Sequence, residues 1–185
     1  MNHAKIILEC LDRHLSDPVE LTLYGRAALA LGFRRVPEDY ALSRDVDAVL
    51  WLGQAEQLNE TTNFWPAVEQ TNEEMADGDL YISHFFEEDQ VILQPDWKAH
   101  RISLPGDWRF LRLFRLGDLD LLLSKLMRDD PIDHSDALFI VHAAGLDAGS
   151  VRRAMGRARV PDSPEIREQF ATASARLLSA MATAT

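Results

Sequence analysis

The spacing of apolar residues in the first part of the chain predicts two helices and two strands. Apolar side chains recur at helical spacing over residues 3–15, whereas residues 19–24 alternate between apolar and polar. Gly25 interrupts this alternation, and the strong helix formers of residues 27–31 follow it. The predicted order is therefore helix, strand, glycine turn and helix. Residues 46–52 are predicted to form the next strand.

The middle of the chain carries further β-prone runs. A helix is predicted over residues 63–76, followed by a hairpin of two short strands, residues 80–86 and 90–93, at the far side of the sheet. Residues 101–104 and 110–116 are predicted to add edge strands. From residue 118 onward the apolar spacing is helical. The helices predicted there are residues 118–128, 135–144, 148–159 and 163–182.

Length and composition match a single globular fold, with room for a small appendage. The chain has 185 residues, of which 46% are hydrophobic and 26% are charged, so it can build a real core. The expected fold is α/β (α+β): a mixed β-sheet core over residues 1–116, with a helical C-terminal region over residues 117–185 packed on it.

Cysteine usage and hydropathy point to the cytoplasm. Cys10 is the single cysteine, which excludes an internal disulfide framework and a Cys-rich zinc site. The first residues lack the apolar stretch and small-residue cleavage site of a signal peptide. No apolar run approaches the ~18 residues of a membrane span. We therefore expect a cytoplasmic protein without membrane segments.

The charge of the chain is unevenly distributed. There are 19 Lys and Arg against 30 Asp and Glu, a net charge of −11. Residues 1–100 hold 7 basic and 19 acidic side chains, and residues 101–185 hold 12 and 11. An acidic first half binds phosphates poorly unless cations mediate the contact. Two interpretations remain open: a solvated acidic surface, and a cluster of carboxylates that holds divalent metal ions.

An Asp-x-Asp pair on the second predicted strand favours the metal interpretation. Side chains two apart on a strand point to one face, so Asp45 and Asp47 can converge. Asp is depleted in strands, and two converging carboxylates repel unless a cation lies between them. Mg²⁺ prefers such oxygen ligands together with substrate phosphates. Alternatively, both acids lie in solvent at an exposed edge. Gly25 could likewise bring backbone amides close to phosphate oxygens at a helix N-terminus, or be a plain turn glycine.

Together these motifs resemble a known fold. The strand, Gly25 and helix, followed 20 residues later (45 − 25) by Asp-Val-Asp, resemble the nucleotidyltransferase fold of the DNA polymerase β superfamily. Leu-Tyr-Gly-Arg-Ala-Ala-Leu-Ala-Leu-Gly-Phe and Ser-Arg-Asp-Val-Asp look like the branch of AbiEii-type toxin nucleotidyltransferases and their relatives. The stretch 118–128, Asp-Leu-Asp-Leu-Leu-Leu-Ser-Lys-Leu-Met-Arg, and Asp-His-Ser-Asp after it are similar to a later motif of that branch.

The resemblance implies a metal-dependent enzyme. It would move a nucleoside monophosphate from a nucleoside triphosphate to a hydroxyl of RNA, protein or a small molecule, with Mg²⁺ or Mn²⁺ as cofactor. Asp45 and Asp47 would hold the metals, Gly25 would supply backbone amides, and Lys125 would offset charge on the triphosphate. Asp136 would have a catalytic or orienting role. The branch also implies an antitoxin-like partner.

The chain departs from the family pattern at several positions. Arg26 stands where the family has a small Gly or Ser, and it could instead contribute charge to phosphate. Ser43 matches the family's Thr only in kind. For the third metal-binding acid, Glu87 is chosen because it ends a predicted strand, ahead of the neighbouring acids. His84 on that strand is interpreted as a packed or hydrogen-bonded histidine.

Other interpretations stay open. Lys125 lies in an otherwise apolar helical stretch, where it either reaches a cleft or snorkels from a helix flank. Asp133 and Asp136 begin the next predicted helix, where acids also serve as caps. Two functional alternatives remain. The protein could keep the nucleotidyltransferase fold without its chemistry and act as a binding or regulatory partner, or it could be an unrelated α+β interaction protein.

Overall fold

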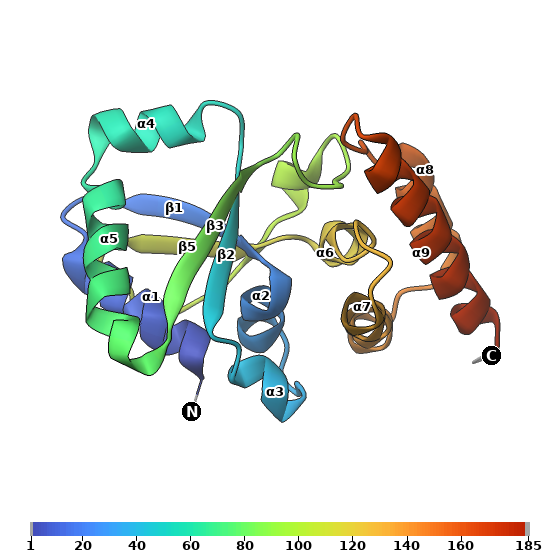
Figure 1. Cartoon of the computed structure of the whole chain (residues 1–185), viewed down its shortest axis with the longest axis horizontal. Coiled ribbons are helices and arrows are strands. Elements are labelled where there is room, and N and C mark those ends of the chain that lie inside the picture. Colours follow the sequence, from blue (N-terminus) through green and yellow to red (C-terminus); the bar gives the residue numbers. More distant parts are fainter. Residues whose placement is uncertain (1, 184–185) are drawn as a thin grey trace. The chain divides into compact units, whose positions relative to one another are not determined.

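The computed structural model describes residues 2–183 and divides the chain into two compact units (Figure 1). Met1–Glu87 and Arg101–Arg115 belong to the first unit. Glu88–His100 and Leu116–Thr185 belong to the second. The chain therefore passes from the first unit to the second, returns for a short segment, and leaves again.

The first unit is built on a mixed sheet. Within the described residues, five strands pair in the order β3-β2-β1-β5-β4. The strands are β1 (Val19–Tyr24), β2 (Asp45–Leu50), β3 (Tyr81–Glu87), β4 (Ile102–Ser103) and β5 (Leu111–Arg115). Strand β1 is antiparallel to β2 and parallel to β5, while β3 runs parallel to β2 and β4 runs antiparallel to β5. Strand β2 is thus an interior strand with a partner on each side.

The helices of the first unit pack against this sheet or against one another. They are α1 (His3–His14), α2 (Gly25–Gly32), α3 (Glu38–Ala41), α4 (Gln54–Thr61) and α5 (Phe64–Met75), followed by the 3₁₀ turn η1 (Ala76–Gly78). Helix α1 buries Ile7, Leu8 and Leu11 on one face, and each such side chain contributes about 1.5–3 kcal/mol by leaving water. Asp12, on the same helix, accepts backbone N–H bonds from the two residues that precede β5 and from Leu111, its first residue.

The two faces of β2 are different. Val46 and Ala48 are buried, whereas Asp45 and Asp47 are only half-buried. Phe85 pairs with Ala48 in the register and makes ring contacts with two aromatic residues of α5, so α5 covers the face that holds the apolar residues. Helices α1 and α5 lie side by side (Figure 1). The aspartates consequently occupy the opposite face of the sheet from α5.

The second unit is helical. Its elements are η2 (Trp97–His100), α6 (Asp118–Ser124), α7 (Pro131–Ala144), α8 (Ala148–Arg157) and α9 (Pro164–Thr183). Asp130 caps α7 by accepting from two backbone N–H groups, Pro131 occupies its first turn, and Gly145 ends it at φ +63°. Burial raises the pKa of the Asp120 carboxyl, although the Gln94 backbone N–H that bonds to it acts in the opposite direction.

The predicted α/β fold with a mixed sheet and C-terminal helices is confirmed. The predicted hairpin of residues 80–86 and 90–93 is wrong, because β3 is an edge strand that pairs with β2 alone, and residue 93 forms only an isolated bridge with residue 159. Val91, Ile92 and Leu93 are all buried, and this short apolar run packs inside the second unit instead of pairing as a strand. Strand β5 was expected at an edge but lies between β1 and β4. Helices α3 and α4 were not predicted.

Membrane-spanning helices were not expected from the sequence. Among the helices described in residues 2–183, none combines the length and the apolar character needed to cross a membrane.

Candidate functional site

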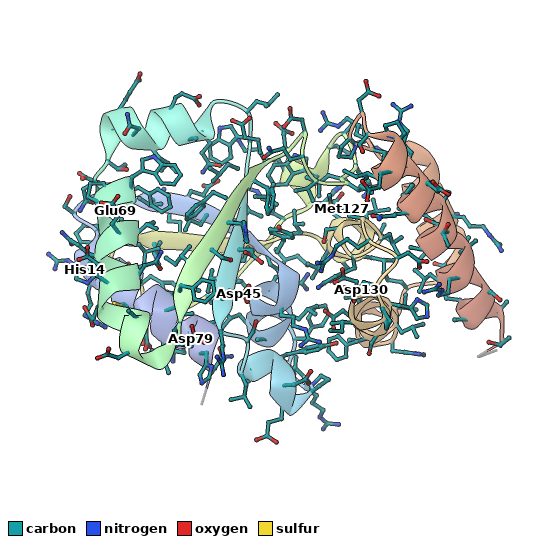
Figure 2. The ribbon with its side chains drawn as sticks, viewed as in Figure 1. His14, Asp45, Glu69, Asp79, Met127 and Asp130 are labelled. Carbon is teal, nitrogen blue, oxygen red and sulfur yellow. The ribbon has the colours of Figure 1, made fainter. Side chains whose placement is uncertain are left out.

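The two aspartates of β2 lie on the same face of the sheet. Residues 45 and 47 are half-buried while their neighbours 46 and 48 are buried, which is the alternation that a strand produces. Asp47 keeps 21% of its side-chain surface exposed. Figure 2 labels Asp45 on β2. The geometry expected from the i, i+2 spacing, two carboxylates on one face of an interior strand, is present.

Gly25 lies beside this pair. Asp47 is the register partner of Tyr24, so the residue that follows Tyr24 starts α2 at the same level of the sheet. Gly25 has φ +67°, and a Cβ built on it would lie 3.3 Å from Asp47 Oδ2. The first backbone N–H groups of a helix have no partner within the helix and carry a partial positive charge. The structure therefore joins a helix N-terminus and a carboxylate at this glycine.

Hydroxyl and imidazole groups hold the two carboxylates. Ser43 Oγ donates to Asp45 Oδ1 at 2.9 Å. Ser83 Oγ donates to Asp47 Oδ1, and His84 Nδ1 lies 3.2 Å from the same oxygen. The hydrogen bonds that side chains of residues 2–183 make to these two carboxylates all go to Oδ1. Oδ2 of each aspartate is therefore left for another ligand. Ser43, one of the predicted residues, is thus brought to the pair.

A β-bulge explains how two consecutive residues of β3 reach one carboxylate. In the parallel register Val46 faces Ile82 and Asp47 faces His84, so Ser83 is an extra residue between them. In a regular strand, Ser83 and His84 would point to opposite faces. His84 is hydrogen-bonded, as interpreted from the sequence, and it also stacks on Phe86. Ser83 was missed, because nothing local in the sequence marks a bulge that depends on strand pairing.

Two predicted residues are not brought to the carboxylates. Arg26 forms an ion pair with Asp39 of α3 at 3.4 Å and lies 5.0 Å above the Tyr40 ring. Glu87 pairs with Leu50, three residues beyond His84 in the register. That spacing amounts to about 10 Å along the strand, and the odd offset turns Glu87 to the face opposite Asp47. The third acid of the predicted metal set is therefore not found beside the pair.

A basic residue that sequence reasoning missed lies on the same face of the sheet. Arg101 Nη1 donates to Glu20 at 2.7 Å and to Thr22 Oγ1 at 3.1 Å. Its guanidinium also lies 4.4 Å from the centre of the Phe114 ring. Thr22 is two residues from Tyr24 on β1, and Tyr24 is the partner of Asp47. Arg101 is thus a first-unit cation on the aspartate face, two residues away along β1.

Lys125 and Asp136 lie together in the second unit. Lys125 Nζ donates to Asp136 Oδ2 at 2.8 Å and to Asp133 Oδ1 at 3.1 Å. Arg128 approaches the other oxygen of Asp133 at 2.7 Å. Lys125 and both aspartates are buried. The cap of α7 is Asp130, so Asp133 and Asp136 act as ion-pair partners of Lys125 rather than as helix caps.

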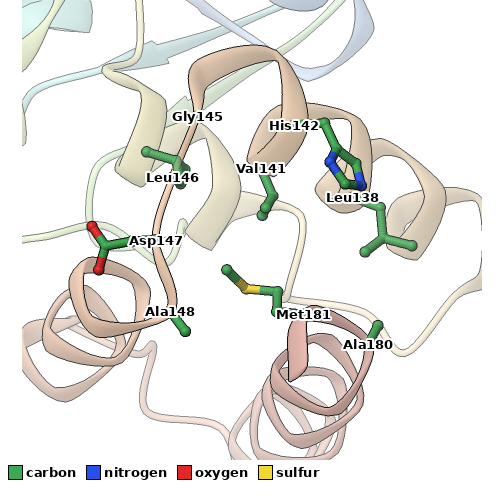
Figure 3. Close-up of a pocket in the computed structure, with 9 residues that line it drawn as sticks. All are labelled: Leu138, Val141, His142, Gly145, Leu146, Asp147, Ala148, Ala180 and Met181. Carbon is green, nitrogen blue, oxygen red and sulfur yellow. The ribbon is translucent and has the colours of Figure 1, made fainter. Parts of the chain in front are cut away.

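A cavity of about 360 Å³ is a separate feature of the second unit (Figure 3). It lies among α7, the turn after it, the start of α8 and the end of α9. Its lining is formed by Leu138, Val141, His142, Gly145, Leu146, Asp147, Ala148, Ala180 and Met181. Asp147 caps α8 through Ser150, and these hydrogen bonds lower the pKa of its carboxyl. This cavity contains none of the predicted site residues.

Comparison with protein-family models gives no match, and comparisons with curated proteins and with solved structures give none either. The function of the chain is therefore inferred from the geometry of its own residues.

Proposed function

We propose that this protein is a metal-dependent nucleotidyltransferase that moves a nucleoside monophosphate from a nucleoside triphosphate to a hydroxyl of RNA, protein or a small molecule. One observation carries the proposal: Asp45 and Asp47 share a face of an interior strand, next to the positive-φ Gly25 at the start of α2. A carboxylate pair beside a helix N-terminus provides ligands for cations and donors for phosphate at one place.

The carboxylate pair suits Mg²⁺ or Mn²⁺. These cations take oxygen ligands, and Mg²⁺ is usually held by one or two carboxylates with water and substrate phosphates. Oδ2 of Asp45 and Oδ2 of Asp47 are the ligand atoms that the described hydrogen bonds leave available. No Lys or Arg within residues 2–183 bonds to either carboxylate, so no basic side chain of that kind competes with a metal ion for Asp45 and Asp47. A bound divalent cation would neutralise charge on the triphosphate.

The reaction assigns distinct tasks to the protein's own groups. The acceptor oxygen bonds to the α-phosphorus, the bond from that phosphorus to the β-phosphate oxygen breaks, and pyrophosphate leaves. The hydroxyl proton passes to a carboxylate of the pair or to water. Ser43, Ser83 and His84 fix the orientation of the two aspartates. Gly25 keeps the α2 N-terminus open to phosphate, because it lacks a Cβ next to Asp47.

A second candidate is a binding or regulatory protein with the same fold and no transfer activity. The ion pairs favour it, because two of the predicted cations already have carboxylate partners. Lys125 is enclosed by two buried aspartates, and Arg26 is paired with Asp39. Phosphoryl-transfer catalysis depends mainly on positioned positive charge. Such a protein would bind a nucleotide with its cation, or an antitoxin-like partner, without catalysing a transfer reaction.

Label transfer separates the two candidates. The purified protein is incubated with each of four α-labelled nucleoside triphosphates, with Mg²⁺ or Mn²⁺, and with RNA and protein from a cell extract. We expect label on an acceptor with the wild type, and a loss of about 100-fold or more in the Asp45→Asn, Asp47→Asn double variant. Asp79→Asn is the matched control, because Asp79 is an exposed acid paired with Arg44.

The outcomes lead to different conclusions. The binding protein would be favoured if the wild type binds nucleotide with metal but transfers no label, and if the double variant no longer binds the nucleotide. Neither binding nor transfer by the folded wild type would contradict both candidates. Equal label transfer by the double variant and the wild type would remove the two aspartates from the mechanism.

A further inference from the structure

A second group of metal-ligating side chains lies away from the β2 aspartates, where α1 packs on α5. Cys10 and His14 are four residues apart on α1, and Glu74 comes from α5. Each of them offers one ligand atom, and these atoms all lie within 4.8 Å of one another. In the described part of the chain, this is the one group of three His, Cys, Asp or Glu side chains that meets such a distance. Figure 2 labels His14 of this group.

The spacing on α1 follows from helical geometry. Residues i and i+4 lie on one face of a helix, one turn apart, so Cys10 and His14 both face α5. His14 Nε2 lies 2.9 Å from Glu74 Oε2. Two ligands of a tetrahedral Zn²⁺ ion at ordinary N and O bond lengths are about 3.3 Å apart. A small opening of the existing His14–Glu74 contact would therefore give these two atoms the separation that the ion requires, and the Cys10 sulfur lies within 4.8 Å of a ligand atom of each residue.

The backbone around the group is fixed before any metal binds. Asn63 Nδ2 donates to the carbonyl oxygen of His14, and Asn63 Oδ1 accepts from the backbone N–H of Ser16. These bonds tie the C-terminal end of α1 to the residue that precedes α5. Arg13 Nη2 holds Glu74 Oε1 at 2.5 Å. Glu74 is consequently oriented with its other oxygen, Oε2, toward His14.

Burial differs along the group. Cys10 is fully buried, while His14 and Glu74 keep 25% and 43% of their side-chain surfaces exposed. The group therefore reaches from the core to the surface, and water has access to its outer side. Burial raises the pKa of the Cys10 thiol, and the neighbouring Glu74 raises it further. The His14 hydrogen bond lowers the pKa of Glu74.

We propose that Cys10, His14 and Glu74 form a Zn²⁺ site with three protein ligands and a water molecule in the fourth position. Thiolate and imidazole ligands select Zn²⁺ over Mg²⁺, which prefers oxygen alone. Binding exchanges the Cys10 thiol proton for a Zn–S bond and releases that proton to solvent. The fourth position faces the exposed side of the group, where His14 and Glu74 reach water. This site is independent of the aspartate pair on β2.

The competing explanation is an ion-pair contact between helices. Glu74 would join α5 to α1 through its contacts with Arg13 and His14. Cys10 would then be a buried residue that only packs in the core. The two explanations differ in one observable property. A metal site bonds the cation to sulfur, whereas an ion pair leaves the thiol protonated.

Cobalt is the probe for this site, because Co²⁺ takes tetrahedral zinc sites and reports sulfur ligation by a near-ultraviolet charge-transfer band. Cys10 is the single cysteine of the chain, so any such band identifies its thiolate. We expect one Co²⁺ per full-length chain, with intense visible bands of tetrahedral geometry, and displacement by Zn²⁺. Zn²⁺ should also raise the melting temperature.

Three variants and one control complete the experiment. Cys10→Ser should abolish the charge-transfer band, and Glu74→Gln and His14→Gln should each weaken Co²⁺ binding by about 10-fold or more. Glu73→Gln, the adjacent exposed acid on α5, should bind as the wild type does. The Glu74 and His14 variants alter groups near the surface, so they remain decisive even if Cys10→Ser unfolds.

Two results would overturn the site. One is a folded wild type that shows no charge-transfer band and no stabilisation at saturating Co²⁺ or Zn²⁺. The other is a charge-transfer band that persists in both Glu74→Gln and His14→Gln with unchanged Co²⁺ affinity, since Cys10 alone would then bind the ion.

Discussion

Each unit contains a pair of aspartates that are close together in sequence, and the two pairs differ in burial and in the groups that bond to them. Asp45 and Asp47 are two residues apart on a strand and half-buried, and they bond to two serine hydroxyls and a histidine ring. Asp133 and Asp136 are three residues apart on a helix and buried. The second pair bonds to Lys125, and Asp133 also bonds to an arginine.

The difference shows which pair the fold itself neutralises. A buried carboxylate is tolerated when a cation and hydrogen bonds accompany it, and Lys125 supplies both to Asp133 and Asp136. The β2 pair bonds to no Lys or Arg of the described residues and has His84 beside Asp47, and we propose that a cation from solution neutralises it. One pair is neutralised within the helical unit, and the other is the candidate binding site.

The largest effect is expected from removing the cation of the buried pair. Lys125→Met leaves Asp133 and Asp136 in the interior without their ammonium partner, and breaking a buried ion pair in this way costs about 3–5 kcal/mol. The free energy of unfolding, measured by urea titration, should fall by that amount. Arg176→Met is the control, because Arg176 pairs with Asp129 near the surface and should cost only about 0–1 kcal/mol.

An equal, small loss of stability in both variants would contradict the structural role given to Lys125. In that case the Lys125 ion pairs would be as weak as a surface pair, and Lys125 would again be a candidate for the phosphate-neutralising cation expected from the sequence.

The sequence predicted the features that lie within a single strand or helix. The alternation of residues 19–24 and the helical spacing of residues 3–15 predicted β1 and α1 closely, because a buried face imposes its period on neighbouring residues. The i, i+2 spacing likewise predicted that Asp45 and Asp47 share a face. These features follow from backbone geometry within one element.

The missed part depends on pairing between elements. Ser83 reaches Asp47 only because the β2–β3 register contains a bulge. Lys125 has two aspartate partners because α7 packs beside α6. Glu87 was chosen for its place at a strand end, which fixes neither its face nor its register. Contacts of this kind join residues far apart in the chain or on different elements, and local patterns do not encode them.

A smaller effect, of the same size in both units, is expected from two positive-φ glycines. Gly25 and Gly145 have φ values of +67° and +63°, so alanine at either position costs about 1–2 kcal/mol of unfolding free energy. Only Gly25 has a neighbour within 4 Å of the added Cβ, the Oδ2 atom of Asp47. Gly25→Ala should therefore also weaken Mg²⁺-dependent nucleotide binding, measured by calorimetry, while Gly145→Ala should leave it unchanged.

Equal nucleotide affinity in the two glycine variants would show that the close approach of Gly25 to Asp47 has no part in binding. Unequal losses of stability would show instead that Asp47 resists the added methyl group, since the backbone strain is the same at both positions.

The smallest effect on stability is expected at the half-buried pair, Asp45 and Asp47. Asp47→Asn removes one of two neighbouring negative charges, and the amide oxygen can still accept from Ser83 and His84. We expect the unfolding free energy without metal to stay within about 0.5 kcal/mol of the wild type, or to rise because repulsion is relieved. Mg²⁺ with nucleotide should then raise the melting temperature of the wild type and of Asp79→Asn, and raise that of Asp47→Asn much less. A large loss of stability in Asp47→Asn, with an unchanged Mg²⁺ response, would show that the β2 pair serves stability, as the buried pair does, and not metal binding.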